Sequence, residues 1–374
     1  MDPVETLANV LFLPRDRLQA LLDVLHDDGY RCIGPQVRDS AIVYDTVTSA
    51  NQFPRGVRDT QAPGCYSLTE FDSTRVFAWA NGPQALKPLT FAPRETLWKA
   101  ERDNQGVLRF SEMRPAPQPL ALIGVRACDL AALRIQDKVF LEGSRQDPYF
   151  QARRQSLLLI AVNCSHPAQT CFCASTGDGP RATHSFDLAL TELDDGFTVE
   201  LGTPRGRDIA KQLHLDAATD AQHYAAGRQH TEAVSAQQRK LPSVAARRSM
   251  MNKLDHPRWD EVAERCLSCG NCTMVCPTCF CHAQEDAAEL AGIHIEHVRQ
   301  WDSCFTQKHS YIHGLVVRSD TRTRYRQWLT HKLATWHDQF GTSGCVGCGR
   351  CIAWCPTGID ITEECTALCG EGPP

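Results

Sequence analysis

The sequence has no long hydrophobic run. Its most apolar stretches, such as 119–125 and 156–162, are far shorter than the roughly 20 residues that a membrane-spanning helix needs. The first residues begin acidic and have neither a basic region nor a long apolar core, so no secretory signal is predicted. Both absences lead us to expect a cytoplasmic protein without a transmembrane segment.

An excess of basic residues is also missing, since 44 acidic residues outnumber 39 basic ones and the formal charge is −5. Proteins that bind nucleic acid usually carry the opposite balance, so we expect no nucleic-acid partner. The chain has no G-x-G-x-x-G sequence after a strand, no G-x-x-x-x-G-K-[ST] loop and no H-E-x-x-H pair. An ordinary nicotinamide or flavin site is therefore not predicted.

Cysteine, in contrast, is abundant, with 19 among 374 residues. The reducing cytoplasm prevents a disulfide framework, so dense cysteine there indicates metal binding or catalysis. Eight of the cysteines form two copies of C-x2-C-x2-C-x3-C-P, the first motif at 266–277 and the second motif at 345–356. This is the ferredoxin pattern for 4Fe-4S clusters, in which three thiolates surround one cluster and the fourth reaches the other.

The two motifs therefore predict two 4Fe-4S clusters with exchanged fourth ligands. The ligands expected for the first cluster are Cys266, Cys269, Cys272 and Cys355, and those for the second are Cys345, Cys348, Cys351 and Cys276. Zinc is the alternative, because paired C-x-x-C sequences also build zinc sites. Four-coordinate zinc would leave the third cysteine and the Cys-Pro pair of each motif unexplained.

The region before the motifs has a mixed α/β pattern. The spacing of Leu18, Leu21, Leu22 and Leu25 predicts an amphipathic helix within 11–30 that ends near Gly29. Strands are predicted at 40–47, 75–81 and 106–113, and a hairpin at 186–202 with its turn at 194–196.

A parallel βαβ unit is predicted from a buried strand at 120–125, a helix at 130–140 capped by Asp129, and a second buried strand at 157–162. Residues that follow the two strands should meet at one sheet edge, where sites of open α/β folds usually lie. Cys128 and Cys164 follow these strands, and Cys171 and Cys173 lie on the loop beyond. We predict a third cluster site there, with ordinary buried cysteines as the alternative.

The remaining cysteines give weaker signals. Cys279, Cys281 and Cys304 are expected to pack around the clusters rather than to form a metal site with His282. No role is predicted for four others: Cys32, Cys65, Cys365 and Cys369.

The predicted fold class is α+β or α/β. An amino-terminal mixed α/β domain (1–207) with the parallel βαβ unit is followed by a helical linker (208–250) and a mostly helical, ferredoxin-like 4Fe-4S dicluster domain (251–374). The two motifs are separated by a long insertion at 277–344, in which 283–293 is expected to be helical.

Six segments together resemble one family: 91–99, 124–140, 162–173, 265–281, 301–304 and 344–356. The chain resembles the iron–sulfur beta subunit of cytoplasmic sulfhydrogenases, which are nickel–iron hydrogenases, and a related subunit of anaerobic sulfite reductase. Family members often have proline where this chain has Ala127, but Cys128 and Asp129 are retained.

The resemblance implies a non-catalytic subunit of an oxidoreductase complex. It would relay electrons between a flavin-containing, NAD(P)-linked partner and the catalytic subunit of a hydrogenase or of a sulfite reductase. An enzymatic alternative is a reductase that binds its own small substrate near Cys128 and Asp129. A zinc-stabilised interaction module is a further alternative.

Overall fold

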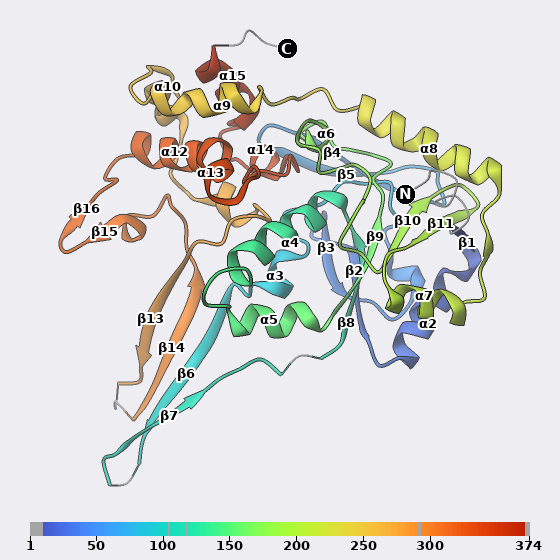
Figure 1. Cartoon of the computed structure of the whole chain (residues 1–374), viewed down its shortest axis with the longest axis horizontal. Coiled ribbons are helices and arrows are strands. Elements are labelled where there is room, and N and C mark those ends of the chain that lie inside the picture. Colours follow the sequence, from blue (N-terminus) through green and yellow to red (C-terminus); the bar gives the residue numbers. More distant parts are fainter. Residues whose placement is uncertain (1–9, 104, 117, 291–292, 371–374) are drawn as a thin grey trace.

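The computed structural model describes residues 10–103, 105–116, 118–290 and 293–370 (Figure 1). The prediction of no secretory signal rests on residues 1–18, and the first nine of these lie outside this part. An eight-stranded sheet has the strand order β12–β1–β11–β10–β9–β8–β2–β3. Its strands are β1 (Leu11–Pro14), β2 (Arg31–Arg38), β3 (Ala41–Thr46), β8 (Leu120–Val125), β9 (Leu157–Val162), β10 (Leu188–Glu192), β11 (Gly196–Leu201) and β12 (Asp216–Ala217).

The middle of this sheet is parallel, since β9 pairs in parallel with both β8 and β10, and β8 with β2. The helix α4 (Ala127–Phe140) connects β8 with β9, so the predicted βαβ unit is confirmed. The predicted hairpin is also confirmed as β10 and β11, which pair antiparallel. Fully buried parallel strands explain why 157–162 is an unbroken apolar run.

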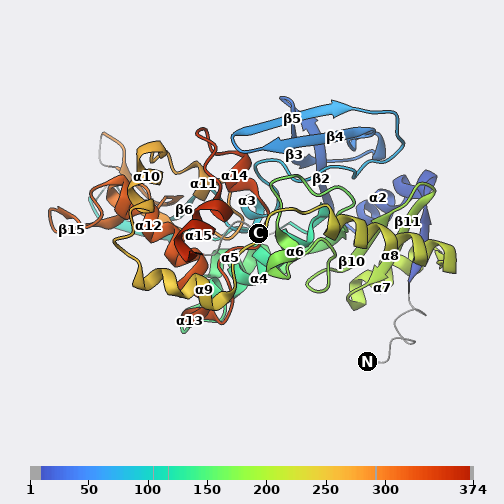
Figure 2. The same ribbon diagram turned by 90° about the horizontal axis from the view of Figure 1, so that it is seen from above.

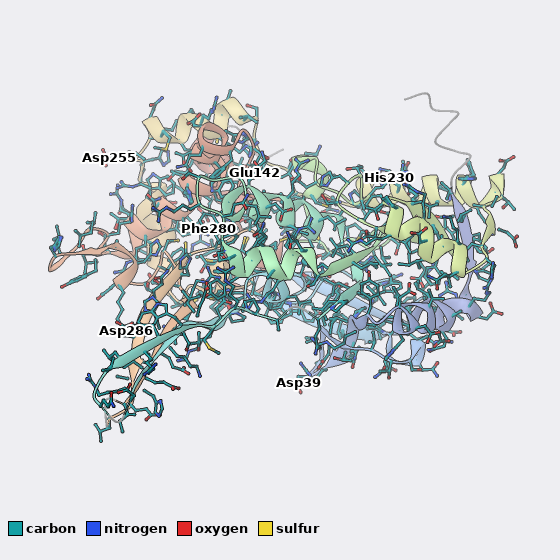
Figure 3. The ribbon with its side chains drawn as sticks, turned by 60° about the horizontal axis from the view of Figure 1, so that its bottom comes forward. Asp39, Glu142, His230, Asp255, Phe280 and Asp286 are labelled. Carbon is teal, nitrogen blue, oxygen red and sulfur yellow. The ribbon has the colours of Figure 1, made fainter. Side chains whose placement is uncertain are left out.

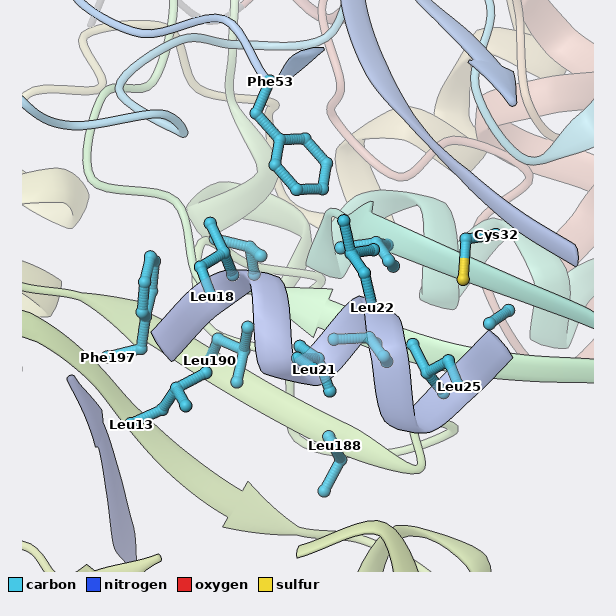
Figure 4. Close-up of a cluster of buried hydrophobic side chains, with 14 of the residues drawn as sticks. Leu13, Leu18, Leu21, Leu22, Leu25, Cys32, Phe53, Leu188, Leu190 and Phe197 are labelled. Carbon is cyan, nitrogen blue, oxygen red and sulfur yellow. The ribbon is translucent and has the colours of Figure 1, made fainter. Parts of the chain in front are cut away.

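Helices cover both faces of the sheet. On one face, the four predicted leucines of α2 (Leu18–Asp27) pack against side chains of β10 and β11 together with α7 (Pro204–Gln212), as Figure 4 shows for α2. On the other face, α4 and α5 (Pro148–Gln155) pack against β8 and β9. The helix predicted within 11–30 is thus shorter than expected, because Leu11–Pro14 is a strand of the sheet, paired with β11 on one side and β12 on the other.

The strand predicted at 75–81 is wrong. This segment is buried but pairs with no strand, because carboxylates rather than a neighbouring backbone accept its N–H groups. The Glu192 carboxylate accepts hydrogen bonds from the backbone nitrogens of Val76 and Phe77 at 2.7 and 2.8 Å. Alternating apolar residues therefore reflect burial here, not a strand. Nearby, β4 (Val57–Ala62) and β5 (Cys65–Glu70) form a separate hairpin.

A second, four-stranded sheet projects from the body and is called the arm (Figure 1). It joins β6 (Arg94–Arg102) and β7 (Leu108–Glu112) to β13 (His282–Ala288) and β14 (His294–Trp301) in the order β13–β14–β6–β7. The helix predicted over 283–293 is therefore wrong for its described residues. The Ala- and Glu-rich sequence favours a helix, but antiparallel pairing with β14 outweighs that weak preference. Residues 291–292 lie outside the described part.

The central contact of the arm joins segments nearly 200 residues apart. Lys99 of β6 forms an ion pair with Glu296 of β14 at 2.9 Å, and Trp98 stacks on His297 with ring centroids 4.8 Å apart. At the base, Arg299 pairs with both Glu95 and Asp147. The long insertion is thus tied to the amino-terminal region by backbone pairing and by buried charge.

The long helix α8 (Asp220–Ser235) runs along the edge of the body, and most of the remaining helices follow it in the chain (Figure 2). Helical structure within 208–250 is as predicted, whereas the predicted domain boundaries stay a prediction. The other elements are α3 (Lys87–Thr90), α6 (Cys173–Thr176), α9 (Val244–Ser249), α10 (Arg258–Arg265), α11 (Asn271–Met274), α12 (Thr321–Thr330), the π-helical turn η5 (His331–Thr335), α13 (Trp336–Phe340), α14 (Arg350–Ala353), α15 (Ile361–Cys369) and the short hairpin of β15 (Tyr311–Ile312) and β16 (Leu315–Val316).

Candidate iron–sulfur centres

The two cysteine motifs form the same loop. In each, a glycine with positive φ follows the second cysteine and precedes a one-turn helix, Gly270 before α11 at +73° and Gly349 before α14 at +70°. The fourth cysteine of each motif has a threonine hydroxyl two residues later, with Sγ to Oγ1 distances of 3.1 Å for Cys276 and 3.5 Å for Cys355. The helices α11 and α14 contact each other, so the two loops face one another.

The first three cysteines of the first motif lie around a pocket together with the last cysteine of the second motif. The pocket is lined by Cys266, Cys269, Cys272, Cys355 and Cys351, with apolar walls that include Phe305, Tyr325 and Trp328. Burial raises the pKa of the Cys266 thiol, a hydrogen bond from the Ser268 backbone lowers it, and electrostatic interactions with Cys355 and Cys269 raise it further. Cys355 thus lies with the opposite motif, as the exchanged ligand set requires.

Cys276 lies among the thiols of the second motif. Burial raises the pKa of Cys345 to about 12 and that of Cys348 to about 11, and the neighbouring Cys276 thiolate contributes to both shifts. Cys351 has Cys345, Cys348 and Cys276 as neighbours and also interacts with Cys272 of the first motif. The structure therefore brings together both sets of four cysteines and places the two sets next to each other.

A buried lysine, which sequence reasoning missed, lies beside this second set. Lys332 in η5 donates hydrogen bonds to Cys276 Sγ at 3.3 Å, to Thr278 Oγ1 at 2.9 Å and to the Gly344 carbonyl at 3.1 Å. Burial would lower the pKa of its ammonium group, but the electrostatic interactions with Cys276, Cys279 and Cys345 outweigh burial and raise it. Lys332 is therefore a cation that offsets thiolate charge, and no pattern in the sequence indicates it.

The third cysteine group lies directly against the second motif. Cys171 interacts with Cys173 and Cys164, Cys128 interacts with Cys173, and all but Cys164 interact with Cys348. The backbone joins the two groups as well, because the Phe172 N–H donates to the Gly347 carbonyl at 2.8 Å. The Gln237 side-chain amide donates to Cys173 Sγ at 3.4 Å. The four predicted cysteines of this group are thus neighbours, next to the second motif.

Asp129 has another role than the predicted helix cap. Its carboxylate forms a buried ion pair with Arg350 of the second motif, at 2.7 and 2.9 Å, and also accepts from the Asn81 amide. The first residue of α4 follows Arg126, which has no side-chain capping bond. Since Asp129 and Arg350 are 1% and 2% exposed, the pair is a desolvated link between α4 and the cysteine motifs.

The second loop tolerates only glycine at position 349. A Cβ added there would lie 2.3 Å from the Thr170 carbonyl oxygen, in addition to the strain of φ +70°. We expect Gly349→Ala to lower the free energy of unfolding by more than the ~1 kcal/mol typical of conformational strain, and to loosen the loop. Gly341→Ala is the matched control, because φ is +69° and the added Cβ meets nothing within 4 Å. Equal losses in urea unfolding would contradict a steric role for Gly349.

Among the residues that the structure describes, no three His, Cys, Asp or Glu side chains are placed to hold a single metal ion. This finding concerns a single bound ion and does not bear on a 4Fe-4S cluster, in which each thiolate binds a different iron.

The motifs match two family models, both described as a 4Fe-4S dicluster domain, at residues 265–359 and 229–280. Together with the paired cysteine sets, these matches define the class as an iron–sulfur electron-transfer protein. The chain is 32% identical over 281 residues to sulfhydrogenase 2 subunit beta of Pyrococcus furiosus, covering 73% of this chain and 79% of that protein. It belongs to this family of sulfhydrogenase beta subunits.

No solved structure matches the chain. In the described residues, none of the helices has both the length and the apolar character needed to span a bilayer.

The charge of Lys332 is expected to set the reduction potential of the nearby cluster. Reduction adds negative charge, so removing a buried cation in Lys332→Met should lower the midpoint potential of one cluster by several tens of millivolts. A redox titration followed by electron paramagnetic resonance measures this shift. Lys253→Met is the control, because Lys253 donates to the Leu368 and Cys369 carbonyls, outside both proposed ligand sets. An unchanged potential in Lys332→Met would contradict the expectation.

Proposed function

We propose that this chain relays electrons between the catalytic subunit of a nickel–iron hydrogenase and a flavin-containing, NAD(P)-linked partner. The observation that carries the proposal is the proximity of the two cysteine sets, since Cys351 of one set lines the same pocket as Cys272 of the other and interacts with it electrostatically. Two clusters held by these sets would be neighbours, and one-electron carriers that lie close together can pass electrons stepwise. The printed name of the Pyrococcus relative supports the hydrogenase partner.

The proposed ligands keep the exchanged arrangement. Cys266, Cys269, Cys272 and Cys355 hold the first cluster, and Cys345, Cys348, Cys351 and Cys276 hold the second. The neighbours of Cys276 and of Cys355 support this assignment, because each interacts with the thiols of the opposite motif. Each cluster would carry one electron at a time. The chain supplies the thiolate ligands, the apolar walls of the site and the Lys332 cation.

A third cluster on Cys128, Cys164, Cys171 and Cys173 would extend this path into the α/β region. Its support is the mutual proximity of the four thiols and their position beside Cys348. The amide hydrogen bond from Gln237 to Cys173 Sγ is of the kind that tunes a thiolate ligand.

A second candidate function is reduction of a small molecule by this chain itself. A cavity of about 350 Å³ adjoins Cys164 and is lined in part by Arg181, His223 and His230. For the relay function, an anaerobic sulfite reductase is the alternative to the hydrogenase as the complex that contains this chain. Turnover by the isolated, cluster-loaded chain with an artificial electron donor would favour the second candidate.

The test of the proposal is iron and acid-labile sulfide per chain in anaerobically purified protein, together with the reduced electron paramagnetic resonance spectrum. About eight irons with spin-coupled signals is the result expected for two clusters, and about twelve the result for three. Colourless protein that contains zinc would overturn the proposal. Electron transfer that begins only when the flavin and hydrogenase subunits are added would support the relay, whereas turnover without them would contradict it.

A further inference from the structure

Three cysteines outside the proposed cluster ligands converge at the base of the arm. Cys279 and Cys281 precede β13, and Cys304 follows β14. The antiparallel pairing of these strands continues past their ends, because the Asp302 N–H donates to the Cys281 carbonyl at 2.9 Å. Figure 3 shows Asp286 out on the arm and Phe280 where the arm joins the body. The hairpin thus brings together cysteines that are far apart in the chain.

Two of these thiols contact each other directly. The Cys304 thiol hydrogen-bonds the Cys281 thiolate, which lowers the pKa of Cys281 to about 6, while His309 and Lys332 favour the same charged form. The same bond raises the pKa of Cys304. A thiolate held by a neighbouring thiol is the arrangement of dithiol pairs that form and break disulfides. Cys279 differs, since its thiol bonds instead to the proposed cluster ligand Cys276.

The pair is accessible to small reactants. Both cysteines line a cavity of about 470 Å³ and are partly exposed. Its walls also carry Arg318, His309 and Lys332, so the cavity has a cationic character that favours thiolate over thiol. On the other side, Cys304 interacts electrostatically with Cys272, a proposed ligand of the first cluster.

We propose that Cys281 and Cys304 form a redox-active dithiol–disulfide couple that exchanges electrons with the neighbouring 4Fe-4S clusters. In the oxidising direction, the Cys304 thiol loses its proton to water in the cavity, one S–S bond forms with the Cys281 thiolate, and two electrons pass to the two oxidised clusters, one to each. In the reducing direction, the two reduced clusters return these electrons, the S–S bond breaks and Cys304 regains a proton. This proposal rests on the proposed function in one respect, because the clusters are the source of the electrons.

The physical gain is a change in electron number. Each cluster carries one electron, whereas a disulfide takes up two, so the couple would convert single-electron transfer into a two-electron reaction at a cavity open to small molecules. The thiols are not placed around a single metal ion in the described residues, which favours the redox role over a mononuclear site.

The test uses the full-length, cluster-loaded chain under anaerobic conditions. Protein oxidised with glutathione disulfide, then alkylated and digested, should yield a linked pair of peptides containing Cys281 and Cys304, and treatment with dithiothreitol should abolish it. Two electron equivalents of dithionite should then bleach the cluster absorbance, which recovers as two alkylatable thiols appear per chain. In Cys304→Ser the absorbance should stay bleached. Cys65→Ser is the matched control, because Cys65 is exposed on β5 and is not among the residues that line the cavity of Cys281 and Cys304, and it should behave as wild type.

Three results would overturn the couple. These are absence of the linked peptides in wild type, recovery of absorbance in Cys304→Ser, and loss of about four irons per chain in Cys281→Ser or Cys304→Ser, which would make these residues cluster ligands. The peptide measurement needs no variant, so a poorly folding substitution cannot mask the result. Wild-type protein without clusters would refute the proposed function, whereas the peptide experiment with glutathione and dithiothreitol would still test the thiol pair.

Discussion

Cys276→Ser is expected to empty the centre built on the second motif and to leave the centre of its own motif intact. The reason is that Cys276 lies among Cys345, Cys348 and Cys351, and its side chain is not among those that line the pocket of the first motif. Iron should fall by about four per chain, and the spin-coupled spectrum should become that of one isolated cluster. Serine binds iron more weakly than a thiolate does, so the change removes a ligand with little change in volume.

The mirror variant sharpens this experiment. Cys355→Ser should empty the first centre instead, and the two variants should therefore leave clusters with different potentials, because Lys332 donates a hydrogen bond to Cys276 of the second centre. Cys32→Ser is the control, because Cys32 is buried in the core under α2. This variant should retain both clusters. If each variant lost the cluster of its own motif, the exchanged assignment would be wrong.

Asp129→Asn is expected to destabilise the chain by about 3–5 kcal/mol. It would leave the buried Arg350 guanidinium without its carboxylate partner, and an unpaired buried charge costs far more than the pair itself contributes. The urea midpoint, followed by circular dichroism and by cluster absorbance, should fall by roughly 1 M or more. Because Arg350 precedes Cys351, cluster absorbance should be lost together with the helical signal or before it.

Two further variants distinguish charge burial from other causes. Asp45→Asn breaks the exposed pair with Arg38 and should cost no more than about 1 kcal/mol. Replacing both buried partners, as Asp129→Leu with Arg350→Met, should recover much of the lost stability, because neither charge then remains unpaired. If the double variant were destabilised as much as Asp129→Asn alone, this explanation would be contradicted.

The buried ion pair and the arm both connect the carboxy-terminal cysteine region to the amino-terminal region. Asp129 ties α4 to the second motif, and the β6–β14 pairing ties the insertion to the amino-terminal region. The cysteine motifs are thus held by contacts from segments far away in the chain. Such support keeps thiolates in place before and after electron transfer, when the charge of a cluster changes.

The predictions of secondary structure that proved correct rested on patterns among residues close together in the chain. The βαβ unit and the hairpin of β10 and β11 were predicted correctly, since their apolar runs and turn residues act over a few positions. The segment 75–81 was mispredicted because a distant partner decides its structure, since two Glu192 oxygens accept the N–H groups of Val76 and Phe77. The segment 283–290 was mispredicted because it pairs with the following strand β14, which in turn pairs with the distant strand β6.

By itself, the sequence determined the chemistry of this protein, because the spacing of eight cysteines defines which thiolates can surround a cluster, and its family resemblance followed from the same segments. Only the tertiary structure decided what surrounds those thiolates. Lys332, the partner of Arg350 and the contact between Cys281 and Cys304 all join residues that carry no shared pattern along the chain. Burial and charge act through space, and the positions that share them are fixed by packing and strand pairing, not by distance in the sequence.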